Sequence, residues 1–421
     1  MNAEQLLLSI VAAMYIPFLF LTSVYTASLL VGVAKVRSER LPISEGSAQR
    51  TAGEDAGERR CLGVVIPLYR EDVHSIAATV KSILRQRSGV SLRLYFVLEE
   101  EDLETRQALI DALQRLGIAE KELQFEVIVR SGGRSSKAAA INYSLQSVSE
   151  DYILFLDSAI ELGSATLIED IVKLLKRYDV VFMPVEMGRG RGLTDTIALI
   201  DTAGWFEHVL PLIWLSTGYP VVNGGCFAAR KALLLKILPL PEDVLTEDAY
   251  MRILFYKHRP SVAMLRSCCV KSPPRSIIEF AKQRLRWYRG YYQCIIHSFR
   301  LLGPRRGLKA SIPFLTPLVN ASQLLSAIFI ILSIALHVLG SPMDAFMKLV
   351  LLAALTHMFA TFVTGVYGSY TVLSKRMARS LALAYSLLYP LLMLAEGALA
   401  LGALAAPRIG WYRTRRSYVM R

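Results

Sequence analysis

The sequence has little cysteine, with five residues among 421, of which only Cys268 and Cys269 are neighbours. No C-x-x-C pair occurs, so the spacing supports neither a disulfide framework nor a paired-cysteine zinc site. The few thiols suit a reducing compartment such as the cytosol. Internal repeats and low-complexity segments are also absent from the sequence, which gives no indication of a solenoid architecture.

Charge is almost missing from four long stretches, which are residues 6–34, 311–340, 345–373 and 381–406. Lys348 and Glu396 are the only charged residues in them. Each stretch is long enough to cross a hydrocarbon core about 30 Å thick, because a helix rises about 1.5 Å per residue. With 53% hydrophobic residues overall, the chain is expected to be an integral protein of the cell membrane that carries one substantial soluble domain.

The first apolar stretch predicts a transmembrane helix within residues 1–36. It is too long for the apolar core of a signal peptide, and its basic residues follow it rather than precede it. Lys35, Arg37 and Arg40 stand directly after the stretch. The positive-inside bias therefore places the middle of the chain in the cytoplasm and the amino terminus outside.

The three later apolar stretches predict a carboxy-terminal membrane region over residues 311–406, with two to three spans. Three full crossings would put the basic tail, residues 407–421, outside the cell, against the same positive-inside bias. One stretch is therefore expected to be re-entrant or interfacial. Pro313 and Pro317 favour the first of the three, because each proline ring removes a backbone donor from a helix.

Basic residues gather beside the hydrophobic stretches of this chain, whose formal net charge is +13. They are concentrated between residues 284 and 309 and again between residues 375 and 379. This placement predicts contact with anionic lipid headgroups. The sequence carries no signature of a nucleic-acid-binding module, so we expect membrane lipids, and no nucleic acid, among the partners.

Residues 61–275 have the pattern of an α/β domain, and a polar linker over residues 37–60 precedes them. Apolar runs alternate with amphipathic stretches; the runs are residues 63–67, 92–98, 125–129 and 152–156, and the stretches are residues 76–84, 105–116, 137–145 and 167–175. This alternation predicts a largely parallel sheet covered by helices. Ligands of such sheets bind outside the carboxyl ends of the strands.

Acidic and aromatic residues stand at those expected strand ends. Tyr69 and Glu71 follow the first run, Glu99 and Glu100 follow the second, and Asp157 follows the fourth. A single charged residue at a strand end is usually only solvated. Three acidic strand ends together with a tyrosine predict a binding site at this edge of the sheet.

A Q-x-x-R-W pattern stands 35 residues after Asp248 and consists of Gln283, Arg286 and Trp287. It lies in residues 276–310, where apolar residues recur at near-helical spacing and predict an amphipathic interfacial helix. Simpler interpretations stay open for both motifs. Such a helix can lie on lipid without a further role, and Glu247 with Asp248 can merely cap a helix.

With these motifs the chain resembles the membrane-bound family 2 glycosyltransferases, the group that contains cellulose, chitin and hyaluronan synthases. The similarity covers roughly residues 62–290 and rests most on Thr246-Glu247-Asp248 and on the Q-x-x-R-W pattern. It implies an α/β catalytic domain in the cytosol with the GT-A, Rossmann-like fold. The resemblance also implies an amino-terminal transmembrane helix and carboxy-terminal interfacial and transmembrane helices.

The resemblance implies how a nucleotide-sugar donor is held. Pro67, Tyr69 and Glu71 would form the nucleotide pocket, with the tyrosine ring packed on the base. Glu99 or Glu100 stands where such enzymes place an aspartate that contacts the uracil, and the choice within the acidic run stays open. The acidic run therefore belongs with the base-binding end of the expected site.

The expected site for Mg²⁺ or Mn²⁺ departs from the family pattern. Asp157 stands at the first aspartate of the usual D-x-D, but Ala159 replaces the second, and alanine cannot bind a metal. Asp157 would still contact the nucleotide sugar, and Glu161 is a candidate substitute ligand because hard cations take oxygen ligands. Strand alternation can aim Glu161 correctly or wrongly. Lys137 resembles the family lysine that helps to hold the donor, which suits a diphosphate, although an exposed lysine at a helix start is the simpler alternative.

The acceptor side of the expected site comes from two segments. Asn223-Gly224-Gly225 resembles the small-residue segment that lines the acceptor site, although paired glycines suit a plain turn equally well. Trp287 would stack on the acceptor sugar. Gln283 and Arg286 would line the diphosphate or acceptor end, and arginine suits that role through its forked donors and permanent charge.

The resemblance makes Asp248 the candidate general base, with Glu247 beside it. In inverting transfer an acceptor hydroxyl attacks the anomeric carbon opposite the departing diphosphate, so one carboxylate near the incoming oxygen can accept the proton. Glycoside hydrolysis differs, because two carboxylates flank the bond there. Lys271 is a departure from the family, since related enzymes often have an acidic residue at this place before proline.

Two classes of function remain open. The first is an inverting hexosyl or N-acetylhexosaminyl transferase that moves a sugar from a nucleotide-diphosphate donor, expected to be UDP-linked, to a polysaccharide or lipid-linked acceptor. Within it, the Q-x-x-R-W pattern favours a processive synthase, whereas the small number of spans favours a single-transfer glycolipid enzyme. The second is a non-catalytic membrane binding protein with a degenerate GT-A domain, which Ala159 favours and the retained Asp248 and Trp287 disfavour.

Overall fold

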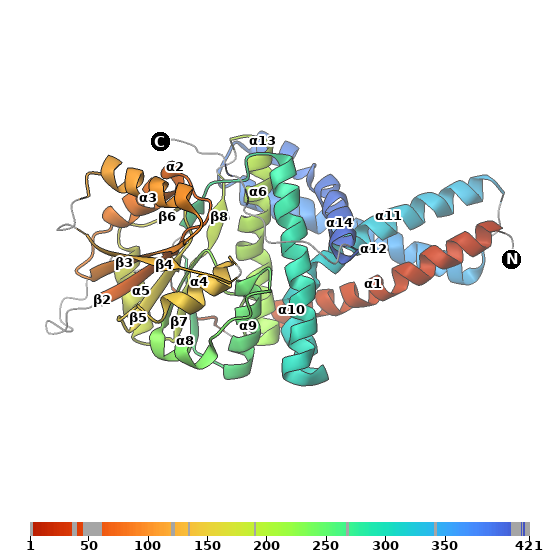
Figure 1. The fold of residues 1–421 in the computed structure, drawn as a ribbon. Coiled ribbons are helices and arrows are strands. Elements are labelled where there is room, and N and C mark those ends of the chain that lie inside the picture. Colours follow the sequence, from red (N-terminus) through yellow and green to blue (C-terminus); the bar gives the residue numbers. More distant parts are fainter. Residues whose placement is uncertain are drawn as a thin grey trace. The chain divides into compact units, whose positions relative to one another are not determined.

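The computed structural model describes residues 3–35, 40–44, 61–118, 123–133, 135–188, 191–266, 269–340, 343–405, 414 and 416. The chain divides into two compact units, coloured along the sequence in Figure 1. The helical unit comprises Met1–Ser38, Arg189–Gly218 and Ser276–Thr414, and the sheet unit comprises Glu39–Gly188, Tyr219–Arg275 and Arg415–Arg421. Most of the expected linker over residues 37–60 lies outside the described residues.

An eight-stranded sheet forms the centre of the sheet unit, in the order β1-β10-β7-β9-β5-β2-β3-β4. Its strands are β1 (Ile43–Ser44), β2 (Cys61–Pro67), β3 (Ser91–Glu99), β4 (Gln124–Arg130), β5 (Tyr152–Leu156), β7 (Val180–Phe182), β9 (Cys226–Arg230) and β10 (Val262–Leu265). Neighbouring strands run parallel except where β9 pairs with β5 and β7. The largely parallel sheet expected from the sequence is confirmed.

Side-chain alternation along the strands distributes the helices over the two faces of this sheet. Val64 and Ile66 of β2 belong to one continuous core with α2 (Val73–Leu84), α3 (Leu103–Arg115) and α5 (Leu167–Leu175). The residue between them, Val65, is equally buried on the other face. Figure 1 shows α2 and α3 on one side of the sheet and α4 (Lys137–Ser144) on the other. Burial on both faces explains why the sequence of β2 is a nearly continuous apolar run.

A second sheet has three strands in the order β6-β11-β8. These are β6 (Ile160–Glu161), β8 (Val185–Met187) and β11 (Cys269–Lys271). Strand β11 pairs antiparallel with β6 and parallel with β8. The small sheet therefore brings β6, which follows β5, beside β11. This pairing places residues of the candidate site next to one another.

Two further helices complete the sheet unit. They are α8 (Lys231–Ile237) and α9 (Glu247–His258), and α9 begins at the acidic pair expected from the sequence. The side chain of Thr246 makes no capping hydrogen bond to α9. Side chains do cap three other helices of this unit, namely Asp72 for α2, Asp102 for α3 and Ser136 for α4. The acidic pair of α9 is therefore not explained by a side-chain cap at Thr246.

The helical unit holds four helical segments that are long and apolar enough to cross a membrane: Tyr15–Lys35, Ile277–Val338, Ala345–Leu373 and Arg379–Ala405. Its helices are α1 (Ala3–Lys35), α6 (Leu193–Gly204), α7 (Leu210–Thr217), α10 (Ile277–Ser311), α11 (Thr316–Val338), α12 (Ala345–Leu373), α13 (Arg379–Ser386) and α14 (Tyr389–Ala405). By length and composition, these four segments of the described residues are candidate membrane spans.

Breaks within the helical unit fall at identifiable residues. Helix α10 is interrupted at Gly303, whose φ of 73° is left-handed, and Pro304 restarts it, as expected for a glycine and proline at a helix junction. Pro313 lies in a short 3-10 turn and Pro317 in the first turn of α11. Neither proline therefore interrupts α11, which is continuous over 23 residues. The last apolar segment is the divided one, since α14 has only 17 residues.

Candidate active site

Asp157 stands directly after β5, at the carboxyl end of that strand, and two lysines hold its carboxylate. Oδ1 lies 2.5 Å from Nζ of Lys137, and Oδ2 lies 2.5 Å from Nζ of Lys271. Lys137 is the first residue of α4, and Lys271 is the last residue of β11. The charges of Asp157, Lys137 and Lys271 therefore meet at one point. They come from the end of β5, the start of α4 and the end of β11.

Gly224 joins this charge cluster to Asp248. Its carbonyl oxygen accepts a hydrogen bond of 2.5 Å from Lys137, and its N–H donates to Oδ2 of Asp248 at 3.1 Å. Oδ1 of Asp248 accepts from its neighbour's N–H in the first turn of α9, at 2.8 Å. A methyl group on Gly224 would stand 2.7 Å from Cβ of Asp248, so only glycine permits this approach.

The loop around Gly224 is fastened on both sides. Oδ1 of Asn223 accepts from the N–H of Gly225 at 2.6 Å, which closes a tight turn. The carbonyl oxygen of Gly225 accepts from the N–H of Asp157 at 2.9 Å. Glu247 completes the cluster, with Oε1 3.2 Å from Nζ of Lys137. The structure thus brings together most of the residues that the sequence analysis singled out in this unit.

The two aspartates of the cluster have opposite electrostatic surroundings. Burial alone would raise the pKa of Asp157, but Lys137 and Lys271 outweigh it and hold that pKa well below the usual range. Burial and the neighbouring Glu247 raise the pKa of Asp248 to about 6, although Lys137 opposes the shift. Asp157 therefore stays ionised, whereas Asp248 can take up a proton near neutral pH. Such a division of roles is typical of acid–base chemistry.

The turn after β2 is held by the start of α3. Arg70 has a left-handed φ of 54°, its N–H donates to the carboxylate of Asp102, and its guanidinium carbon lies 5.1 Å from the ring centre of Tyr69. The N–H of Glu71 donates to Oγ1 of Thr105 at 2.8 Å. Asp102 therefore shapes the turn that carries Tyr69 and Glu71, just after Pro67 ends the strand.

The acidic run at the end of β3 contains two carboxylates in different surroundings: Glu99 forms an ion pair, and Glu100 faces solvent. Glu99 is buried, and its two oxygens lie 3.0 Å and 2.6 Å from Nε and Nη2 of Arg130. Burial raises the pKa of Glu99 even though Arg130 opposes the shift. Glu100 is exposed to solvent. The structure thus distinguishes two residues that the sequence left as equal candidates for the base-binding role.

This geometry, with acidic residues and a lysine at the carboxyl ends of a parallel sheet, agrees with the comparison to known families. Residues 63–238 match the model of Glycosyl transferase family 2. The matched region contains the turn after β2, Lys137, Asp157 and Gly224, and it ends before Asp248 and the Q-x-x-R-W pattern. The sheet unit accordingly has a GT-A-like α/β fold with a mixed sheet.

A solved structure with a TM-score above 0.5 supports this fold. A mannosyltransferase from Pyrobaculum calidifontis, in complex with GDP-Man and Mn²⁺, is 15% identical, with a TM-score of 0.54 over 93% of this chain and 99% of that one. Glucosyl-3-phosphoglycerate synthase from Mycobacterium tuberculosis, with Mn²⁺ and UDP-Glc, is 20% identical, with a TM-score of 0.39 over 58% and 83%. No curated protein matches the chain.

Mn²⁺ accompanies GDP-Man in the Pyrobaculum structure, yet Asp157 and Glu161 do not fit such an ion here. In the β6–β11 pair, Glu161 lies opposite Val270 and Ile160 lies opposite Lys271. Residues directly opposite each other share a face, and neighbours along a strand do not. Glu161 therefore points to the face away from Lys271, which is the residue bonded to Asp157. Among the described residues, no cluster of three His, Cys, Asp or Glu could hold a metal ion.

The residues of the Q-x-x-R-W pattern lie on α10, which belongs to the helical unit. Gln283 is buried, and the ring of Trp287 packs on Arg284, whose guanidinium carbon is 4.2 Å from the Trp287 ring centre. Arg284 also pairs with the carboxylate of Asp201 on α6. Within its own unit, Trp287 thus packs on an arginine that the pattern does not include. The expected donor and acceptor roles of Gln283, Arg286 and Trp287 remain predictions.

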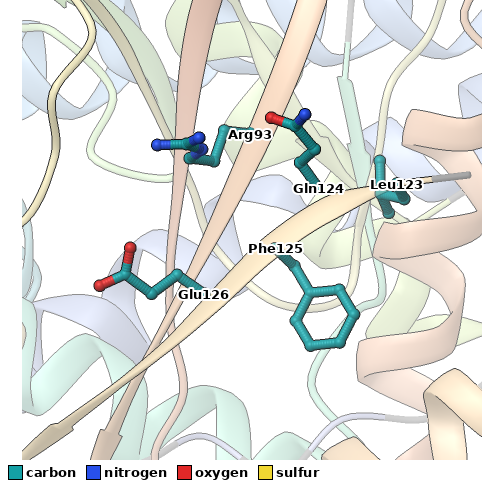
Figure 2. A pocket seen from close by; sticks show the side chains of 5 residues that line it. All are labelled: Arg93, Leu123, Gln124, Phe125 and Glu126. Atoms are coloured by element: carbon teal, nitrogen blue, oxygen red, sulfur yellow. The ribbon is translucent and has the colours of Figure 1, made fainter. Parts of the chain in front are cut away.

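An open pocket in the sheet unit lies away from this candidate site. Figure 2 shows its lining residues, which belong to β3, to β4 and to the residue before β4: Arg93, Leu123, Gln124, Phe125 and Glu126. Arg93 and Gln124 are paired near the amino ends of these two parallel strands. Because ligands of such sheets bind at the opposite, carboxyl ends, the pocket does not compete with the cluster around Asp157.

Sequence reasoning missed three residues of the sheet unit's charged edge. Lys271 was noticed only as a departure from the family, Asp102 only as part of an acidic run, and Arg416 only as part of the basic tail. Arg416 donates from Nη1 to the carbonyl oxygen of Ser272 at 2.5 Å and forms a β-bridge with Pro274. The lysine in place of an acidic residue was the one available signal, since the partners of Asp102 and Arg416 lie far from them in the sequence.

Proposed function

We propose that this protein is an inverting glycosyltransferase that moves a sugar from a nucleotide-diphosphate donor to a glycan or lipid acceptor at the cytoplasmic face of the cell membrane. One observation carries the proposal. The peptide of Gly224 bonds Asp248 through its N–H and Lys137 through its carbonyl oxygen, and Lys137 bonds Asp157. A carboxylate able to accept a proton thus stands one peptide away from a charge cluster suited to a diphosphate.

In the proposed reaction, an acceptor hydroxyl oxygen forms a bond to the anomeric carbon of the donor sugar. The bond from that carbon to the diphosphate oxygen breaks, and the nucleoside diphosphate leaves with the electron pair. Asp248 accepts the hydroxyl proton, for which its pKa of about 6 is well matched to neutral pH. Asp248 acts without a covalent partner, because a single displacement inverts the anomeric centre.

The remaining residues have proposed roles on either side of Asp248. On the donor side, the ring of Tyr69 packs on the base, Glu100 contacts it, and Asp157 contacts the nucleotide sugar. On the acceptor side, the loop at Asn223 receives the incoming sugar or lipid. For Trp287 we keep the role that the family resemblance implies, which is stacking on the acceptor sugar. A UDP-linked donor is our first candidate, and a GDP-linked one is the second because the Pyrobaculum mannosyltransferase was solved with GDP-Man.

Two acceptor types correspond to two products. The Q-x-x-R-W pattern supports a processive polysaccharide synthase similar to the cellulose, chitin and hyaluronan synthases. The four candidate spans support a single-transfer glycolipid enzyme instead, because so few helices leave little material for a polymer channel. Product length distinguishes the two directly.

The decisive experiment incubates the purified full chain in lipid nanodiscs with a panel of UDP-sugars and GDP-mannose, and measures nucleotide release and product size. Asp248→Asn should lower turnover by about 10²- to 10⁴-fold, the usual contribution of a general base, while nucleotide binding is retained. Asp243→Asn is the matched control, since Asp243 is exposed in the loop before α9. Normal turnover of Asp248→Asn would refute the role given to Asp248, and no release with any donor would refute the transferase.

A further inference from the structure

We infer that the ammonium group of Lys271 takes the place of a divalent metal ion, so that this protein binds the diphosphate of its donor without Mg²⁺ or Mn²⁺. The inference rests on the proposed function, and it concerns how the same site holds its ligand. It is carried by the contacts of Asp157, by the register of the β6–β11 pair and by the hydrogen-bonding state of two lysines.

Asp157 is the residue through which an ion would have to bind, and both of its oxygens are engaged. Lys137 lies 2.5 Å from Oδ1 and Lys271 lies 2.5 Å from Oδ2. A metal ion on Oδ2 would bring a second positive centre onto the oxygen that Lys271 already neutralises. Mg²⁺ also requires near-octahedral oxygen coordination. Ala159 has no side-chain oxygen, and Glu161 points to the opposite face of the small sheet, so neither residue supplies a ligand.

The strand register positions Lys271 for this role. Lys271 is paired with Ile160, and Cδ1 of Ile160 lies 3.0 Å from the position of a Cβ on Gly225, beside Oδ2 of Asp157. The face of the small sheet that carries Lys271 is therefore the face turned toward the candidate site. Glu161 and Val270 occupy the opposite face.

The hydrogen-bond capacity of the two lysines separates their roles. An ammonium group has three N–H donors. Lys137 places its donors among Asp157, Glu247 and the carbonyl oxygen of Gly224, so it has no capacity left. Lys271 has one acceptor among the described residues, which is Asp157. Its side chain is only 11% exposed. Burying an ammonium group costs free energy when some of its N–H donors lack an acceptor, and a bound anion would supply that acceptor.

A diphosphate oxygen is the ligand that completes this arrangement. It carries the negative charge that a divalent ion balances in a metal-dependent site, and an ammonium group is a known point-charge ligand of phosphate. Arg416 adds positive charge beside Lys271 through its bond to the carbonyl oxygen of Ser272. Lys271 therefore both keeps Asp157 ionised and directs N–H donors at the leaving group.

The first test needs no variant. Titrate UDP and GDP into the purified full chain in nanodiscs by calorimetry, once in excess EDTA and once in MnCl₂. The inference expects dissociation constants that agree within about threefold, since no bound ion contributes to the charge-assisted hydrogen bonds. Nucleotide binding that requires Mn²⁺ would overturn the inference alone. Binding of neither nucleotide in either buffer would overturn the proposed function as well.

The second test removes the ammonium group. Lys271→Met should weaken UDP or GDP binding about tenfold to hundredfold in both buffers, as expected for loss of a hydrogen bond to a charged group, and Lys271→Arg should restore most of it. Lys173→Met is the matched control, because Lys173 pairs with Glu169 on the surface of α5. Unchanged affinity of Lys271→Met, in a variant that keeps the circular dichroism spectrum of the wild type, would overturn the inference.

A converse variant provides an independent readout. Ala159 has a left-handed φ of 60°, a conformation that aspartate tolerates better than most residues. The double variant Ala159→Asp, Lys271→Met should therefore acquire nucleotide binding that Mn²⁺ strengthens and EDTA reverses. Mn²⁺ alone, followed by electron paramagnetic resonance, should bind this variant and not the wild type. Specific Mn²⁺ binding to the wild type would contradict the inference.

Discussion

At the scale of single residues, Asp157 and Asp248 illustrate how position decides the chemistry of one side-chain type. Asp157 lies between two ammonium groups, so its negative charge is stabilised and it does not compete for protons. Asp248 lies beside Glu247 and is held by backbone N–H groups, so its charge is less well compensated. Only the second aspartate can exchange a proton under physiological conditions.

This difference predicts a pH dependence. Asp248 must be ionised to accept a proton, and its pKa is raised to about 6. Turnover should therefore fall as the pH is lowered through about 6, and nucleotide affinity should not follow, because Asp157 remains ionised there. The measurement is kcat/KM between about pH 5 and pH 8, with nucleotide binding at each pH as the control. A profile that stays flat down to pH 5 would contradict the assignment.

At the scale of elements, the helical unit is fastened by a buried polar cluster that joins four helices. Arg284 of α10 pairs with Asp201 of α6 and lies 3.6 Å from Oε1 of Glu396 on α14. Asn320 of α11 donates to Oε2 of Glu396 at 3.0 Å. Ionisable groups within apolar helices are expensive unless they are paired, so the cluster restricts how these helices can pack.

Arg284→Met should therefore destabilise the helical unit by about 3 kcal/mol, because it leaves the buried carboxylate of Glu396 and the half-buried carboxylate of Asp201 without their cation. Thermal unfolding in nanodiscs measures the effect. Arg300→Met is the matched control, since Arg300 is exposed on the same helix α10. Adding Glu396→Leu to Arg284→Met should recover part of the loss. Equal stability of Arg284→Met and the control would show that the cluster is not a stabilising one.

At the scale of the whole molecule, the return of the basic tail constrains the membrane topology. Arg416 bonds to Ser272 and bridges to Pro274 within the sheet unit, so we expect Arg416 and the sheet unit to lie on one side of the membrane. The chain between them must then cross an even number of times. Helix α11 is continuous over 23 residues, whereas α14 has 17, so we expect the divided segment α13–α14, rather than α11, to be the one that does not cross.

The sheet unit is expected on the cytoplasmic side, and Cys61 offers a natural probe. It is exposed at the start of β2, whereas Cys226, Cys269 and Cys294 are buried; Cys268 lies outside the described residues and should be changed to serine beforehand. A membrane-impermeant maleimide should label Cys61 in permeabilised cells and not in intact ones, because the positive-inside bias holds this unit in the cytoplasm. Cys61→Ser is the control, and labelling of intact cells would reverse the topology.

The sequence alone was sufficient for the main elements of the sheet unit, and it supplied several residues of the candidate site. Apolar runs marked β2, β3, β4 and β5, and the ends of three of these runs marked Tyr69, Glu99 and Asp157. Local burial repeats with the period of a strand or helix, so it is written directly into the order of residues. Asp248 became a candidate through the family resemblance instead, because an acidic pair at a helix start is equally consistent with a cap.

Only the tertiary structure decided which charges meet. Lys271 is 114 residues from Asp157 in the chain. Glu161 and Ile160 form a strand of only two residues, which is too short for sequence periodicity to predict which of them faces the site. Pairing over such separations depends on strand order and register, and a shift of one residue exchanges the two faces of a strand. The same holds for Arg284 with Asp201 and Glu396, and for Arg416 with Ser272, because no local pattern records a partner that lies elsewhere in the sequence.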